Sequence, residues 1–157
     1  MTFGDSNRPR PTASIRLTAA EFEVIFQVTK ELRSLPKPII EGAGWSHADV
    51  DHLLSLARGI RGRIEGVPFV HVRMSASDPD SGTLASPSIS NAKYGNASVK
   101  EIVAVLPYRV GREWQRLAEA VVSSLGPREL FLRTGYQTDD VLVATRHLSI
   151  DVRDGQE

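Results

Sequence analysis

The sequence predicts a small α/β protein of the α+β type, with a mixed or antiparallel four-stranded sheet and flanking helices. Apolar residues recur at helical spacing in four segments of the chain. Short segments rich in β-branched residues lie between these segments. The length of 157 residues suits one domain or two very small ones. The expected order of elements is α-β-α-β-β-α-β-α.

The first half of the chain supplies two predicted helices and two predicted strands. Thr18 and Glu21 have the spacing of a capping box and predict a helix start, and the prolines at 36 and 38 end that helix. A short strand is expected over residues 37–41. Ser46 is a favourable N-cap for the second helix. Residues 67–74, rich in valine, predict the next strand.

The second half repeats this alternation. Residues 99–107 predict a buried strand, and residues 111–126 predict an amphipathic helix that stops at a glycine. The apolar segment 128–134 is expected to be the fourth strand. Thr138 is the predicted N-cap of the last helix, with two aspartates in its first turn, where the helix dipole favours negative charge.

A short sequence phrase occurs twice, at residues 39–50 and at residues 130–141. Both copies have an apolar run, a glycine, an aromatic residue and a polar helix start. Gly44–Trp45 and Gly135–Tyr136 are therefore predicted to form structural turns, with both aromatic side chains at least half buried. Two architectures remain open: a ferredoxin-like core built from the middle six elements, or two pseudo-repeated α-β-α units. A true internal duplication is one explanation of the repeat, and coincidental reuse is the other.

The composition predicts one domain with polar ends. Residues 1–15 are expected to be a disordered tail, because they offer little apolar surface to bury. Residues 16–150 form the predicted globular domain, within which residues 75–98 read as a flexible loop rich in Ser, Pro, Gly and Asn. Residues 151–157 are a polar tail.

Charge and cysteine content exclude several classes of function. Lys and Arg number 19, as do Asp and Glu, so bulk electrostatics does not favour nucleic acid or anionic lipid. The absence of cysteine removes disulfides and thiolate metal sites. No apolar run resembles a signal peptide or a membrane span, which predicts a cytoplasmic protein without membrane association.

Motifs for cofactors and metals are not found in the sequence. The cluster at residues 46–52 contains two histidines and two aspartates, but helical spacing turns most of them away from one another. No metal and no cofactor is therefore expected. The candidate catalytic residues are His71, Arg73 and Tyr108. His71 and Arg73 share one face of the predicted strand by alternation, and a lone strand histidine is more often structural.

Arginines near the end of the second helix form a candidate anion contact. These residues are Arg58, Arg61 and Arg63. Complementation of the helix dipole explains them without any ligand. A phosphate contact would recruit Arg109, Arg112 and Arg116 as well, but nucleic acid is the least favoured partner.

Three functions follow as expectations. The first is a non-enzymatic protein-interaction module, such as a regulator, an adaptor or a toxin-neutralising immunity-like protein, with another protein as its partner. The second is a small enzyme or ligand-binding domain with residues 75–98 as a lid. The third is weak nucleic-acid binding through the arginines. Catalysis is not favoured by any motif, and a homodimer through an exposed sheet edge stays open.

Overall fold

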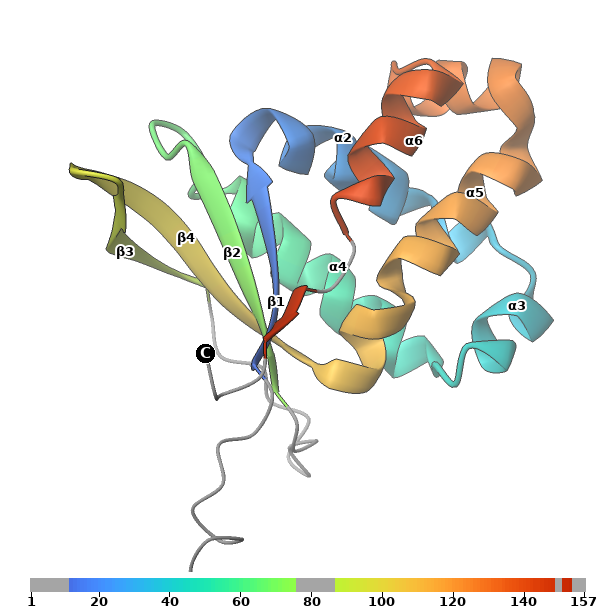
Figure 1. Ribbon diagram of the computed structural model, residues 1–157. Helices are drawn as coiled ribbons and strands as arrows, with labels where there is room; N and C mark the ends of the chain where they lie inside the picture. Colours follow the sequence, from blue (N-terminus) through green and yellow to red (C-terminus); the bar gives the residue numbers. More distant parts are fainter. Residues whose placement is uncertain (1–11, 76–86, 149–150, 154–157) are drawn as a thin grey trace, which may run out of the picture.

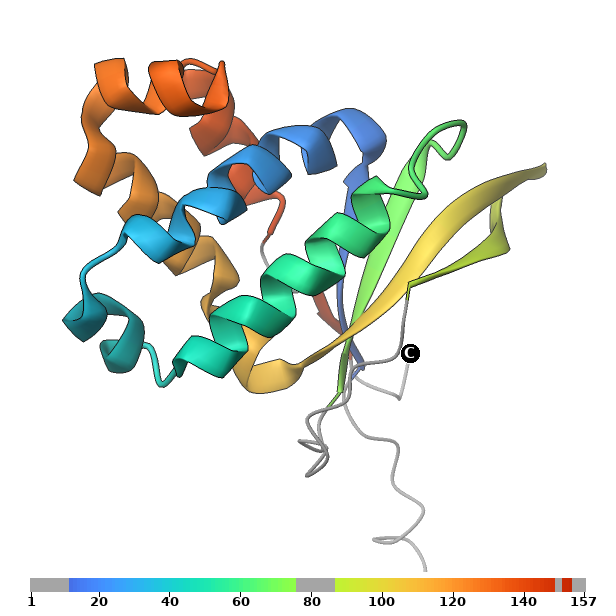
Figure 2. The same cartoon turned by 180° about the vertical axis from the view of Figure 1, so that it is seen from behind.

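One mixed β-sheet and one layer of helices make up the protein (Figures 1 and 2). The computed structural model describes residues 12–75, 87–148 and 151–153. Its strands are β1 (Thr12–Thr18), β2 (Phe69–Ser75), β3 (Ser88–Tyr94), β4 (Ala97–Pro107) and β5 (Asp151–Arg153). Its helices are α2 (Ala19–Thr29), the 3₁₀ helix η1 (Lys30–Ser34), α3 (Lys37–Gly42), α4 (His47–Arg61), α5 (Tyr108–Thr134) and α6 (Thr138–Arg146). The predicted α/β class with a mixed sheet is confirmed.

The sheet has the strand order β3-β4-β2-β1-β5. β2 and β4 run parallel, and every other neighbouring pair of these strands is antiparallel. The helices lie on one side of the sheet, so that side is the inner face (Figure 2). Residues of alternating polarity build both faces, because successive side chains on a strand point to opposite sides.

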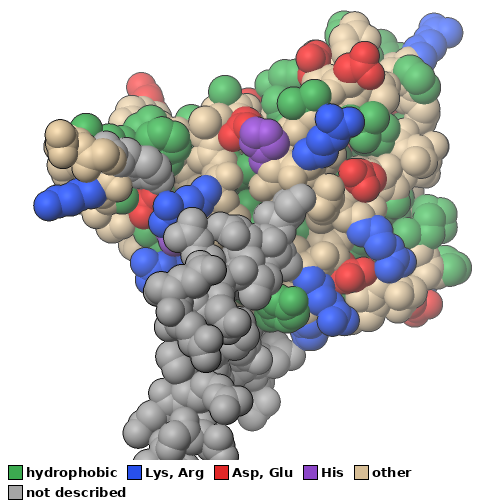
Figure 3. Space-filling view, in the orientation of Figure 1, with side chains coloured by type: hydrophobic (Ala, Val, Ile, Leu, Met, Phe, Trp, Pro, Cys, Tyr) green, Lys and Arg blue, Asp and Glu red, His purple; other side chains and the backbone are tan. Residues whose placement is uncertain are grey.

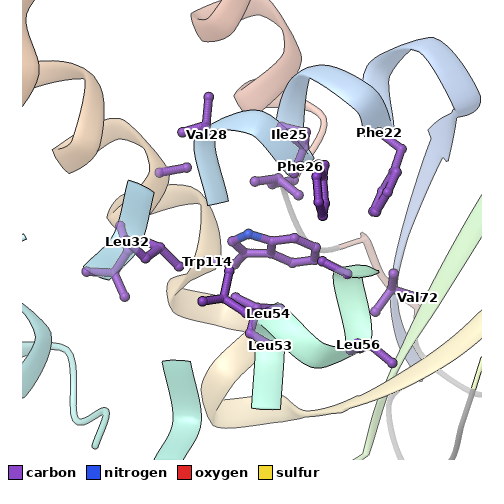
Figure 4. Packing of buried hydrophobic residues seen from close by; sticks show 14 of the residues in the cluster. Phe22, Ile25, Phe26, Val28, Leu32, Leu53, Leu54, Leu56, Val72 and Trp114 are labelled. Atoms are coloured by element: carbon purple, nitrogen blue, oxygen red, sulfur yellow. The ribbon is translucent and has the colours of Figure 1, made fainter. Parts of the chain in front are cut away.

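The core fills the space between the inner face and the helices. The sheet contributes the buried side chains of Ile15, Leu17, Val70, Val72, Ile102 and Leu106. Trp114 of α5 lies between α2 and α4, surrounded by aliphatic and aromatic side chains (Figure 4). Its indole Nε1 donates a hydrogen bond to Oγ1 of Thr29 at 3.1 Å. Trp114 thereby joins three helices into one core.

The N-terminus of α4 is attached to α5 by one carboxylate. Ser46 and Asp49 form a capping box, in which the backbone N–H of Ser46 donates to Asp49 at 2.8 Å. The guanidinium of Arg109 donates to both oxygens of Asp49, at 2.8 and 2.9 Å. Bidentate pairs of this kind are stronger and more directional than single hydrogen bonds. Asp49 therefore positions two helices at once.

Two predicted strands are helical, and this is a correction. Residues 37–41 belong to α3, because a proline in the first turn of a helix loses no hydrogen bond there. Residues 128–134 continue α5 after Gly126, whose φ of 78° marks a kink before Pro127. Within this segment Leu130 and Thr134 are buried at i, i+4 spacing. That helical period, and not the apolar run, decides the structure.

Neither the ferredoxin-like core nor the pair of α-β-α units is formed, because both require these two strands. Each half of the chain instead has a helix, a shorter helical segment, a glycine–aromatic turn and a further helix. Gly44 and Gly135 have φ values of 79° and 82°, in the left-handed region that favours glycine. Trp45 is buried and Tyr136 is partly buried. The internal duplication stays a hypothesis.

Three strands lie where no strand was predicted. β1 includes the end of the expected N-terminal tail, residues 12–15. β3 and the start of β4 lie within the expected loop 75–98. β5 occupies residues 151–153 of the expected polar tail. The rest of these predicted segments, at 1–11, 76–86 and 154–157, falls outside the described residues.

Candidate functional site

The candidate site is the outer face of the sheet, opposite the helices. We use this name for the surface formed by Arg16 of β1, His71 and Arg73 of β2, and Glu101 and Val103 of β4. None of the helices in the described part of the chain packs on it (Figure 1). Figure 3 shows Lys and Arg side chains along the sheet on this side of the molecule.

Strand register brings these residues together. Arg16 lies directly opposite His71 in the antiparallel β1–β2 pair. His71 lies opposite Val103 in the parallel β2–β4 pair. Residues opposite one another share a face of the sheet, and so do residues two positions apart along a strand. Arg73 is therefore beside His71 on the same face, diagonal to Arg16.

His71 is a buried histidine at the centre of the outer face. Its side chain is 8% exposed, and its Nδ1 has no hydrogen-bond partner among the described residues. Nδ1 lies 3.7 Å from Oε1 of Glu101, which is a charge contact too long for a hydrogen bond. Burial, first, and the charge of Arg16, second, lower the pKa of His71, and Arg73 adds to this. Glu101 opposes the shift but does not reverse it.

Arg16 and Arg73 are exposed charges of the outer face. Both side chains are exposed. Neither forms a hydrogen bond or an ion pair with any residue in the ranges 12–75, 87–148 and 151–153. Glu101, in contrast, is 4% exposed and already engaged in contacts. Among the side chains of β1, β2 and β4 that the structure describes, the exposed charges on this face are therefore positive, although the whole chain has a formal charge of zero.

An apolar strip accompanies the cations. Val99, Val103 and Val105 alternate along β4 and are all partly exposed. No described helix covers these valines, so part of their apolar surface is in contact with water. A surface with apolar area beside charged groups resembles the composition of protein interfaces more than that of a closed pocket.

The outer face brings a histidine and a glutamate together with two arginines. A buried histidine near a carboxylate could act as a general base if the group that it deprotonates, from the protein, a water or a substrate, lies within hydrogen-bond reach. Ser88 shares a cross-strand row with Val103 and His71 but lies two strands away from His71. At about 4.8 Å between strands, that separation is about 10 Å. Binding an anionic group between two arginines needs no such partner.

The structure unites two of the three predicted catalytic candidates. His71 and Arg73 are neighbours on the outer face, as alternation predicted, although His71 is buried rather than at the surface. Tyr108 begins α5 after Pro107, which pairs with Ser75. That row is four positions along β2 from His71, about 13 Å at roughly 3.3 Å per residue. Tyr108 is therefore not part of the outer face.

Sequence reasoning missed Arg16 and Glu101. Arg16 lies in the segment expected to precede the first helix, where the alternation of polar and apolar residues over 14–18 was a usable strand signal. Glu101 lies in a strand that was predicted correctly. Its position beside His71 depends on strand pairing and register, which a single sequence does not specify.

The other candidate clusters are engaged within the chain. Arg61 donates to Glu23 at 3.1 and 3.2 Å and stacks on Phe26, and Arg63 donates to the carbonyl of Gly59. Arg58 is exposed. Arg112 and Arg116 both contact Glu113. The proposed phosphate contact thus competes with existing ion pairs at most of its positions.

Comparison with known proteins gives no family for this chain. No protein-family model matches the sequence, and neither the search of curated proteins nor the search of solved structures gave a match. Within the described residues, no helix has the length and apolar character to cross a membrane. The same part of the chain contains no group of three His, Cys, Asp or Glu side chains arranged to hold a metal ion.

The electrostatics of the outer face predict the titration of His71. Arg16→Gln is expected to raise the pKa of His71 towards its ordinary value of 6.5, and Glu101→Gln to lower it further. His71 binds a proton more readily in the unfolded chain than in the folded protein. The free energy of unfolding of the wild type should therefore fall as the pH drops from 6.5 towards the lower folded pKa of His71. NMR titration of the imidazole resonances measures both shifts, with Arg58→Gln as a remote control. An unchanged pKa in Arg16→Gln would show that Arg16 does not face His71.

Proposed function

We propose that this chain is a protein-interaction module and that its outer face binds an acidic segment of a partner protein. The observation that carries this proposal is the pair of exposed arginines, Arg16 and Arg73, which have no ion-pair partner among the described residues and lie on a sheet face that no described helix covers. Carboxylates of the partner would pair with the two guanidiniums. The valine strip of β4 would bury apolar side chains of the same partner.

The charge distribution favours a protein over nucleic acid. Arg16 and Arg73 alone would neutralise too few phosphates for strong binding to a nucleic-acid backbone, whose affinity grows with the number of phosphates contacted. Much of the remaining arginine content near α4 and α5 already pairs with carboxylates of the chain. The proposal therefore requires only a short acidic segment with neighbouring apolar residues.

Self-association through the same face is disfavoured. Two copies joined face to face would place Arg16 and Arg73 near their counterparts, and like charges in an interface are costly. The partner proposed for the outer face is therefore a different protein. Whether the module regulates, connects or neutralises that partner follows from what the partner is.

A charge-reversal experiment tests the proposal. The tagged chain and the variant Arg16→Glu/Arg73→Glu are used to capture proteins from the lysate of the source cells. Any stoichiometric partner is then purified and titrated against both baits by calorimetry. If each reversal costs about 1.4 kcal/mol, the double variant should bind about 100-fold more weakly. Affinity should also fall with added salt.

The matched control is Arg58→Glu/Arg63→Glu, which makes the same change in net charge at the end of α4. It should retain the partner, because neither arginine lies on the outer face. Loss of the partner with this control, and retention with Arg16→Glu/Arg73→Glu, would place the contact on α4 instead. A folded bait that captures no stoichiometric protein would contradict the proposed function.

A further inference from the structure

His71 has a buried ring nitrogen that no hydrogen bond satisfies within the described part of the chain. This nitrogen, Nδ1, lies 3.7 Å from Oε1 of Glu101, and the side chain of Glu101 is itself only 6% exposed. Buried polar atoms are almost always hydrogen-bonded, so an unpaired nitrogen beside a buried carboxylate calls for an explanation. Protonation of the ring would provide one, because it places a donor on Nδ1 and makes a hydrogen bond to Glu101 charge-assisted.

The charges that face His71 come from the strands around it. Arg16 of β1 lies opposite it, Arg73 follows it on the same face of β2, and Glu101 of β4 contacts it. β3 has no charged residue at 88–90, the positions that continue the cross-strand rows of His71 and Glu101. β5 adds two charged residues, at positions two strands away from β2: Asp151 and Arg153. The two arginines oppose a positive charge on the ring, and Glu101 favours it.

The arginines therefore couple the ring to any anion that binds the outer face. A carboxylate paired with Arg16 would offset the positive charge that lies opposite His71. The ring would then take up a proton more readily, and the protonated ring would add a third positive charge beneath the bound anion. Because coupling between two binding events is reciprocal, a protonated ring must strengthen the binding of the anion by the same factor.

We infer that His71 is a proton-linked switch that makes the outer face bind its acidic partner segment more tightly as the pH falls. The inference rests on the proposed function, because it requires a carboxylate at Arg16 or Arg73. Burial, first, and Arg16, second, lower the pKa of His71 in the free protein, so the ring is neutral there at pH values above 6.5. The complex has a higher pKa, and binding takes up protons in the interval between the two pKa values.

The probe for the test is the peptide Glu-Val-Glu-Val-Glu, acetylated and amidated at its ends, whose carboxylates stay ionised above about pH 5.5. Amide shifts of the ¹⁵N-labelled chain give its Kd at about pH 8 and about pH 5.5, in about 0.15 M salt, which screens distant charges. A rise of one pKa unit corresponds to a factor of ten, so the Kd should be about threefold to tenfold lower at the lower pH. Calorimetry of the wild type in two buffers of different ionisation enthalpy should show that binding takes up protons.

A pair of histidine variants assigns the pH dependence to one ring. His71→Gln cannot titrate and should bind the peptide with the same Kd at both pH values. His52→Gln is the matched control, because His52 is an exposed histidine on α4 in the helical layer. This control should keep the pH dependence of the wild type.

The outcomes separate the inference from the proposed function. A peptide that Arg16→Glu/Arg73→Glu binds more weakly than the wild type, but with a wild-type Kd that is equal at both pH values, overturns the inference and leaves the proposed function standing. A pH dependence that His71→Gln retains does the same. A peptide that does not bind the wild type at either pH, or that binds wild type and charge reversal equally, contradicts the proposed function and the inference together.

Discussion

Replacing Trp114 by alanine is expected to lower the free energy of unfolding by about 4 kcal/mol. Trp114 is 1% exposed and is the largest fully buried side chain of the core. It contacts α2 and α4 as well as its own helix (Figure 4). Its removal would leave a large cavity and deprive Thr29 of the indole N–H that it accepts. Urea denaturation followed by circular dichroism measures the loss.

A graded series separates packing from hydrogen bonding. Trp114→Phe keeps part of the ring volume and should cost about 2 kcal/mol, less than alanine. Val143→Ala on α6 is the control, because that side chain is 54% exposed. It should change stability by less than about 0.5 kcal/mol. A Trp114→Ala variant as stable as Val143→Ala would contradict the central position of Trp114 in the core.

Replacing Asp49 by alanine is expected to cost about 2–3 kcal/mol, the second largest effect. The substitution removes the N-cap partner of Ser46 and both hydrogen bonds from Arg109. A double-mutant cycle with Arg109→Met isolates the ion pair from the cap. Because Arg109 is 42% exposed, the coupling energy should be the smaller part of the total. Coupling of zero would show that the pair does not join α4 to α5.

The lowered pKa of Asp49 predicts how the free energy of unfolding changes with pH. Burial alone would raise the pKa of Asp49, but hydrogen bonds from Arg109 and Ser46 outweigh it, so the pKa lies below the ordinary value of 3.8. A carboxylate with a lowered folded pKa contributes stability above its unfolded pKa and loses it as the pH falls through the folded pKa. The stability difference between wild type and Asp49→Asn should therefore shrink below pH 3.8. Thermal unfolding over this range measures it, and a constant difference would contradict the assignment.

Local signals in the sequence predicted the elements that have strong periodicity or caps. The predicted capping box at Thr18 and the predicted N-cap at Ser46 are present in the structure, as is the valine-rich strand around His71. Segment 128–134 was misread because three consecutive apolar residues fit a strand as well as a helix. β3 was missed because it is an edge strand of mainly polar residues, and pairing with β4 rather than its own composition stabilises it.

The candidate site was predictable only in part, for a physical reason. Alternation along one strand placed His71 and Arg73 on a common face without any knowledge of the fold. Arg16 and Glu101 join them through pairing between strands far apart in sequence. Such pairing depends on tertiary packing of the whole sheet, which local propensity does not encode.

The measurement that tests the outer face most directly is an NMR titration of the ¹⁵N-labelled chain with its purified partner. Amide shifts should concentrate on β1, β2 and β4, at Arg16, His71 and Arg73, and should be absent from the first turn of α4. The imidazole of His71 should titrate at a higher pH in the complex, because carboxylates of the partner offset the two arginines. Shifts confined to the helical layer, with His71 unchanged, would contradict the proposal.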